Sequence, residues 1–152
     1  MNSGTPDPVG LFRVVIVDDD ADVRSLLEVV FEVDGRFEVV GTAIDGAQGV
    51  ALVERAQPDV VVLDLRLPVM DGLTAIPLLR RCAPHARIVV FSAFPDPFTL
   101  LDVLRRGADS YIDKAMAWSD LVPTITGLMG TPDELGPAEV DTESTPDEVS
   151  LV

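Results

Sequence analysis

A short aliphatic run that ends in a carboxylate places the strongest constraint on how this chain can fold. Residues Val60 to Leu63 are consecutive aliphatic residues, and Asp64 follows them directly. A run this short and this rich in β-branched residues is typical of a strand buried on both faces inside a parallel sheet. Asp64 is therefore expected at the carboxyl end of a buried strand. In open parallel α/β sheets, ligands and chemistry collect at that edge.

Strand-like segments alternate with helical patterns along the rest of the chain. The predicted strands are residues 12–17, 37–42, 59–63, 87–91 and 109–113. Apolar residues recur at helical spacing after them, and the predicted buried stripes are Val23, Leu26, Leu27, Val30 and Phe31; Ala75, Ile76, Leu79 and Ala83; Leu100, Leu101 and Leu104; and Trp118, Leu121, Val122, Ile125 and Met129. Such alternation predicts parallel βαβ units with right-handed crossovers. The expected fold class is α/β, as a flavodoxin-like doubly wound (βα)5 three-layer sandwich with strand order 2-1-3-4-5.

Glycine and proline interrupt three of the predicted helices. Gly46 and Gly49 weaken the second helix, which begins at Asp45-Gly46. Pro77 lies inside the third helix, where it removes a hydrogen bond and is expected to kink the first turns. Pro123 breaks the pattern of the last helix, which is expected to begin near Ser119.

The two ends of the chain differ in composition from its middle. Residues 1–10 are expected to be a flexible leader and residues 11–130 one folded domain. Residues 131–152 hold seven acidic residues and no basic one, which predicts an acidic disordered tail. The 22 residues after Gly130 are too few for an output domain, so a stand-alone domain is expected.

Composition also bounds the partners and the compartment. The formal net charge is −15 and basic residues do not cluster, so no direct nucleic-acid binding is expected. No apolar run is long enough to cross a membrane and no signal-peptide pattern is present, so no membrane association is expected. With a single cysteine, these features predict a cytoplasmic location.

Polar side chains follow four of the five predicted strands. Asp18 and Asp19 follow the first strand, Asp64 the third, Ser92 the fourth and Lys114, the only lysine, the fifth. With strand order 2-1-3-4-5 these side chains converge in one crevice. Three carboxylates stay ionised together only if a cation neutralises them. Oxygen ligands without His or Cys favour Mg²⁺, for which Mn²⁺ can substitute. A carboxylate beside such a cation and an ammonium is suited to attack a phosphoryl group.

These residues and their neighbours resemble the receiver domain of two-component response regulators over roughly residues 12–130. The resemblance rests on Val17-Asp18-Asp19 with Arg24, on Leu63-Asp64 followed by Leu67-Pro68 and Met70-Asp71-Gly72, on Phe91-Ser92-Ala93, and on Gly-Ala-Asp-Ser-Tyr-Ile-Asp-Lys at 107–114. One departure is Ala115, because proline usually follows the lysine in this family.

The resemblance implies a role for each site residue. Asp64 would be the phosphoacceptor, Asp19 a direct metal ligand, Asp18 the holder of a metal-bound water and the main-chain carbonyl of Arg66 the remaining protein ligand. Ser92 would be the switch hydroxyl, Lys114 the partner of phosphate and carboxylate, and Tyr111 the aromatic ring that changes rotamer with Ser92.

The implied function is a phosphoacceptor signal receiver. A sensor histidine kinase or histidine phosphotransfer protein would supply the phosphoryl group in a Mg²⁺-dependent reaction, and phosphorylation would switch a protein-interaction face. The domain would promote its own phosphorylation and dephosphorylation without being a conventional enzyme. One alternative is a phosphorylation-independent interaction module of the same fold. Another is a Mg²⁺-dependent aspartyl phosphatase, although Arg66 stands where such enzymes usually carry a second acid.

Overall fold

The structure is a computed structural model that describes residues 10–93, 96–115 and 118–130. The predicted leader, apart from Gly10, and the predicted tail lie outside the described residues. The strands are β1 (Phe12–Val17), β2 (Phe37–Ala43), β3 (Val60–Leu63), β4 (Arg87–Ser92) and β5 (Ser110–Asp113). The helices are α1 (Ala21–Asp34), α2 (Gly46–Ala56), α3 (Gly72–Cys82), α4 (Pro97–Arg106) and α5 (Leu121–Met129), with a 3-10 turn at Trp118–Asp120. Every predicted strand is present, with ends that agree to within one residue.

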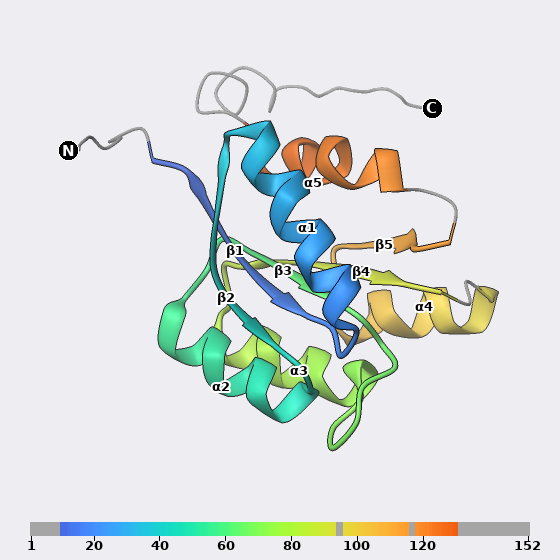
Figure 1. Ribbon diagram of the computed structural model, residues 1–152. Helices are drawn as coiled ribbons and strands as arrows, with labels where there is room; N and C mark the ends of the chain where they lie inside the picture. Colours follow the sequence, from blue (N-terminus) through green and yellow to red (C-terminus); the bar gives the residue numbers. More distant parts are fainter. Residues whose placement is uncertain (1–9, 94–95, 116–117, 131–152) are drawn as a thin grey trace, which may run out of the picture.

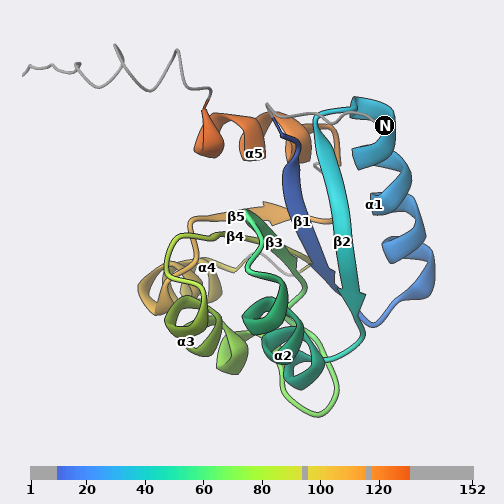
Figure 2. The same ribbon diagram turned by 90° about the vertical axis from the view of Figure 1, so that its left-hand side faces the viewer.

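The strands form one parallel sheet in the order β2-β1-β3-β4-β5. Helices α1 and α5 cover one face, and α2, α3 and α4 cover the other (Figures 1 and 2). The predicted fold class and strand order are therefore confirmed. The order in which strands are added to the sheet reverses between β1 and β3, the two strands that the acidic residues follow.

The buried residues form one cluster on each face of the sheet. Strand β3 supplies both clusters, because Val60 and Val62 point toward α1 and α5 whereas Val61 and Leu63 point toward α2, α3 and α4. All four residues are buried. The continuous aliphatic run thus results from burial on both faces, as expected for a central parallel strand.

Two predicted stripes are partly wrong. In α1, Leu27 and Phe31 are buried, but Leu26 is 50% exposed. In α4 the only buried residue is Val103, which the periodicity did not single out; the exposed leucines of the predicted stripe are Leu100, Leu101 and Leu104. Helix α4 contacts the edge strand β5, so little of its surface reaches the core. Its apolar residues occupy more than one side, and spacing alone could not identify the buried one.

The last helix begins later than predicted. Residue Ser119 belongs to the 3-10 turn, and α5 starts at Leu121 without a side-chain cap bond. Pro123 consequently lies in the first turn of α5, where a helix leaves its N–H groups without intrahelical partners. The proline that interrupts the apolar pattern is compatible with this position.

Among the described helices, none combines the length and apolar character needed to cross a bilayer.

Candidate functional site

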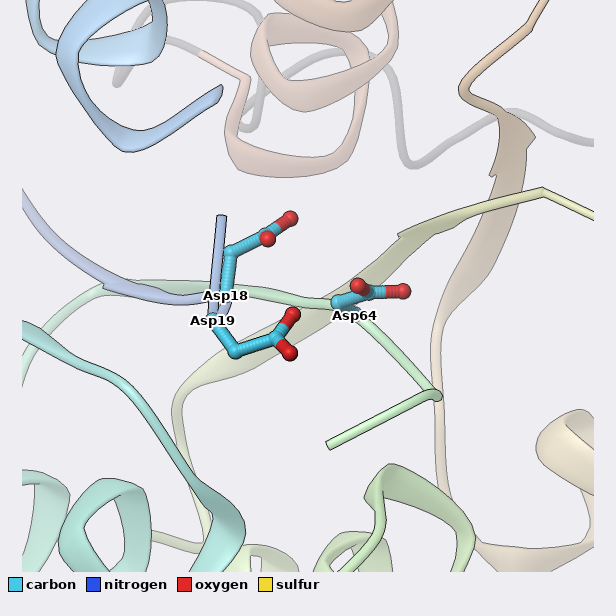
Figure 3. A group of neighbouring side chains, drawn as sticks. All are labelled: Asp18, Asp19 and Asp64. Atoms are coloured by element: carbon cyan, nitrogen blue, oxygen red, sulfur yellow. The ribbon is translucent and has the colours of Figure 1, made fainter. Parts of the chain in front are cut away.

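Three carboxylates gather at the carboxyl edge of the sheet. Asp18 and Asp19 directly follow β1, and Asp64 directly follows β3, which pairs with β1 in parallel. One oxygen from each carboxylate lies within 4.8 Å of the others. Figure 3 shows the three side chains. Asp18 and Asp64 are buried, whereas Asp19 is exposed to solvent. The predicted convergence of these three residues is therefore present.

Lys114 neutralises part of this negative charge. Its Nζ donates to Asp18 Oδ2 at 2.8 Å and to Asp64 Oδ2 at 3.2 Å. Burial alone would lower the pKa of the Lys114 ammonium, but the hydrogen bond to Asp18 and the charges of Asp64 and Asp18 together raise it above its ordinary value. Lys114 is thus held in the charged form. With three carboxylates and one ammonium, the cluster still carries excess negative charge.

Burial acts against the charged form of Asp18. Burial raises the pKa of its carboxyl above the ordinary value, and the nearby charge of Asp64 adds to the effect, against hydrogen bonds from Lys114 and from the backbone N–H of Asp20. A bound cation would oppose this rise by stabilising the charged form. The carboxylate and carbonyl oxygens here are ligands that hard cations prefer.

Ser92, the last residue of β4, also contacts Asp64. Its hydroxyl is buried and donates to Asp64 Oδ1 at 2.6 Å. The Ser92 hydroxyl oxygen also accepts a hydrogen bond from the backbone N–H of Leu65 at 3.3 Å. The hydroxyl is therefore already fixed beside the carboxylate.

Tyr111 lies one strand further along the sheet, on β5. Its side chain is partly buried, and its hydroxyl donates to the backbone carbonyl of Ala93 at 2.9 Å. Ala93 directly follows Ser92, so Tyr111 contacts the same turn that presents the serine. The predicted rotamer change of Tyr111 stays a prediction.

Backbone hydrogen bonds hold the loop that presents Asp64. The N–H of Gly46 donates to the carbonyl of Met70 at 2.9 Å, and the N–H of Gly72 donates to the carbonyl of Leu65 at 2.8 Å. A Cβ at Gly46 would clash with the carbonyl oxygen of Met70. A Cβ at Gly72 would lie 2.5 Å from the carbonyl oxygen of Asp64. We interpreted Gly46 from sequence as a weakness of α2, but its lack of a side chain permits this close approach.

Two neighbours of the first strand shape the same edge. Nη1 of Arg24 donates to the backbone carbonyl of Asp18 at 2.8 Å. The side chain of Asp20 caps α1 by accepting from the N–H groups of Asp22 and Val23. Asp20 therefore serves the helix, and Asp18 and Asp19 are the members of the acidic triplet that face the site.

A family model for the response regulator receiver domain matches residues 14–126. The chain belongs to this family. Curated relatives include a transcriptional regulatory protein PrrA from Mycobacterium leprae, 36% identical over 129 residues, which cover 85% of this chain and 53% of the relative. A protein-glutamate methylesterase/protein-glutamine glutaminase from Maricaulis maris is 37% identical over 107 residues, which cover 69% of this chain and 27% of the relative. The chain thus spans about half or less of the length of these relatives.

Solved receiver structures share the fold. A CheX-CheY-BeF3-Mg²⁺ complex from Borrelia burgdorferi contains a chain that matches with a TM-score of 0.74 at 27% identity, covering 78% of this chain and 90% of that one. A CheY-like receiver domain protein from Methanospirillum hungatei matches with a TM-score of 0.75 at 25% identity, covering 84% of this chain and all of that one. The resemblance inferred from the motifs is confirmed, and the chain is a receiver domain of the two-component type.

The receiver has a groove on one side of the Asp64 to Ser92 contact. It measures about 410 Å³, and Leu65, Leu73, Ser92 and Thr99 are among the residues that line it. Arg66 also lies on its wall, and the backbone N–H of Arg66 is 3.4 Å from Asp64 Oδ1. The use of the Arg66 carbonyl as a metal ligand stays a prediction.

Proposed function

We propose that this receiver accepts a phosphoryl group from a phosphohistidine onto the Asp64 carboxylate and relays it as a change in protein contacts. The observation that carries the proposal is the surroundings of Asp64. This buried carboxylate contacts one hydroxyl and one ammonium, and two further acids stand at the same edge of the sheet. That set matches the needs of phosphoryl transfer, which depends on positioning and on neutralised charge.

The acidic residues fit a divalent cation. Asp19 and Asp64 would bind it directly, Asp18 would hold a water of its shell, and the Arg66 carbonyl would complete the protein ligands. The cation, Mg²⁺ with Mn²⁺ as a substitute, supplies charge that neutralises the phosphoryl oxygens when bound. The Borrelia complex contains Mg²⁺ together with beryllofluoride, which supports this assignment.

The proposed step balances without a further reactant. A carboxylate oxygen of Asp64 attacks phosphorus, the P–N bond to the donor imidazole breaks, and the imidazole nitrogen keeps the electron pair. Lys114 contributes positive charge next to the new acyl phosphate, and Ser92 turns its hydroxyl toward a phosphoryl oxygen. Tyr111 follows Ser92, and the populations of the α4, β5 and α5 face shift. Water later attacks the same phosphorus, so the receiver limits the lifetime of its own signal.

The partners follow from this chemistry. The donor is a sensor histidine kinase or a histidine phosphotransfer protein, and the site of action is the cytoplasm. PrrA, a relative, is named as a transcriptional regulator, but the match covers only 53% of its length. We expect output through protein contact and no direct binding of nucleic acid by residues 10–130.

Intact-mass measurement tests the proposal. Wild-type protein incubated with acetyl phosphate and Mg²⁺ is expected to gain one phosphoryl group, and Asp64→Asn is expected to gain none. Asp71→Asn is a matched control, because Asp71 follows the same loop but its side chain caps α3 through the N–H of Thr74. If neither acetyl phosphate nor a phosphorylated kinase ever adds this mass to the wild type, the proposal is wrong and the phosphorylation-independent module is favoured.

A further inference from the structure

A proline in the interior of α3 leaves one backbone carbonyl without its usual helical partner. Pro77 has no N–H to donate to the carbonyl of Leu73, one turn earlier. In this structure that carbonyl accepts a hydrogen bond from Nη1 of Arg106 at 3.1 Å. Arg106 is the last residue of α4. A side chain of α4 therefore replaces a hydrogen bond that α3 lacks.

The Arg106 side chain is oriented by its own helix. Its Nε donates to Asp102 Oδ1 at 2.9 Å, one turn earlier in α4. A second arginine joins the helices in the opposite direction, because Arg80 of α3 donates to the carbonyl of Gly107, just after α4, from Nη2 at 2.7 Å. The two helices lie side by side in both views (Figures 1 and 2). These contacts attach the C-terminal part of α4 to α3.

The turn that Arg106 holds is next to the candidate site. Leu73 lies in the first turn of α3 and directly follows Gly72, whose N–H bonds to the carbonyl of Leu65 in the Asp64 loop. Leu65, Leu73 and Ser92 line the same groove beside Asp64. A displacement of the first turn of α3 would therefore move one wall of this groove and, through the Gly72 hydrogen bond, the loop that follows Asp64.

We propose that Arg106 is a positioning residue for the phosphoacceptor site, which it serves by supplying to the first turn of α3 the hydrogen bond that Pro77 removes. The tether itself follows from the contacts between α3 and α4. Its consequence for phosphorylation rests on the function proposed above.

A double-mutant cycle in urea tests the tether without reference to phosphorylation. Arg106→Gln is expected to lower the unfolding midpoint by about 0.3 M urea. In a Pro77→Ala background the same change should have less than half that effect, because the substituted alanine has an N–H that bonds to the Leu73 carbonyl. Arg105→Gln is the matched control: it removes an equal charge from the same end of α4, and Arg105 makes no polar side-chain contact in the described part of the chain. Asp102→Asn removes the ion pair alone.

The rate of phosphorylation of Asp64 by acetyl phosphate tests the positioning role. Arg106→Gln is expected to slow this rate about two- to fivefold, and Pro77→Ala in the same chain should restore it. Arg105→Gln should leave it unchanged. Restoration by a second substitution separates positioning from a general loss of stability, since every variant is measured far below its unfolding midpoint.

The outcomes separate the tether from the positioning role. Equal midpoint losses for Arg106→Gln in both backgrounds would overturn the tether. A tether confirmed in urea, with an unchanged phosphorylation rate in Arg106→Gln, would overturn the positioning role alone. If wild type is not phosphorylated at all, the proposed function and the positioning role both fail, and the urea cycle still decides the tether.

Discussion

Charged side chains cluster both where the parallel strands begin, the amino edge of the sheet, and where they end, the carboxyl edge. The two clusters differ in how their charges are paired. At the amino edge, Asp109 Oδ2 accepts from Arg80 Nη2 and from the backbone N–H of Ile88, each at 2.8 Å, and Arg87 lies 3.7 Å from the other oxygen. Arg80 also donates to three backbone carbonyls. At the carboxyl edge, the Lys114 ammonium pairs with Asp18 and Asp64, and the third carboxylate, Asp19, stands beside them without an ion pair in the described part of the chain.

The difference separates structure from chemistry. At the amino edge, side chains hold the loops together, and their hydrogen-bonding capacity is used within the chain. At the carboxyl edge, backbone hydrogen bonds from Gly46 and Gly72 hold the loops. The acidic side chains there keep negative charge that a cation can neutralise, and Asp64 keeps a carboxylate that can attack a phosphoryl group. Substitutions should therefore change stability in different ways at the two edges.

Gly72→Ala is expected to have the largest effect on stability. The new Cβ would lie 2.5 Å from the carbonyl oxygen of Asp64 and 2.7 Å from Leu65 Cα, and backbone atoms cannot move aside cheaply. We expect a loss of about 3 kcal/mol in the free energy of unfolding, measured in urea. Gly127→Ala in α5 is the control. It meets nothing within 4 Å and should stabilise by about 0.5–1 kcal/mol. Equal effects at both glycines would show that close packing does not hold the carboxyl edge.

Asp109→Ala should rank second, with a loss of about 2 kcal/mol in the free energy of unfolding. It leaves the Arg80 guanidinium and the N–H of Ile88 without their shared acceptor in a partly buried place. Arg87→Gln removes only the more distant partner and should cost little. Both variants should still be phosphorylated on Asp64 under stabilising conditions. An Asp109→Ala protein as stable as wild type in urea would contradict the structural role given to the amino edge.

Asp19→Asn should have the smallest effect, and one of opposite sign. The Asp19 side chain accepts no hydrogen bond in the described part of the chain and stands within 4.8 Å of two other acids. Without divalent cations, its neutralisation should raise the thermal midpoint by about 1–2 °C. Mg²⁺ at about ten times its Kd should stabilise wild type by about 1.4 kcal/mol. Asp19→Asn should lose most of that gain. If Asp19→Asn were less stable than wild type without metal, excess negative charge would not be what destabilises this end of the sheet.

The fold, and the gathering of the candidate site residues at one end of the sheet, were largely predictable from sequence. Strand β3 is buried on both faces, so its aliphatic run identified it and located Asp64. The sheet order then brought Asp18, Ser92 and Lys114 to the same edge. These inferences succeeded because burial and strand direction leave few alternatives for where such side chains can lie.

Other features depend on contacts between distant segments and were not predictable. Val103 rather than Leu104 is buried in α4 because of where that helix lies on the sheet. The propensity of Gly46 disfavours a helix, and its close approach to the Met70 carbonyl depends on a segment distant in sequence. The bond from Arg106 to the carbonyl one turn before Pro77 needs two helices in register, and no local pattern encodes that arrangement.

Locating the phosphoryl group on the chain tests whether Asp64 is the phosphoacceptor. Phosphorylated protein can be reduced with borohydride, which converts an aspartyl phosphate to homoserine, and the altered residue can then be located by tandem mass spectrometry. We expect homoserine at position 64 and unaltered aspartates at positions 18 and 19. Homoserine in place of Asp18 or Asp19 in wild type, with Asp64 unmodified, would contradict the assignment of Asp64 as the phosphoacceptor.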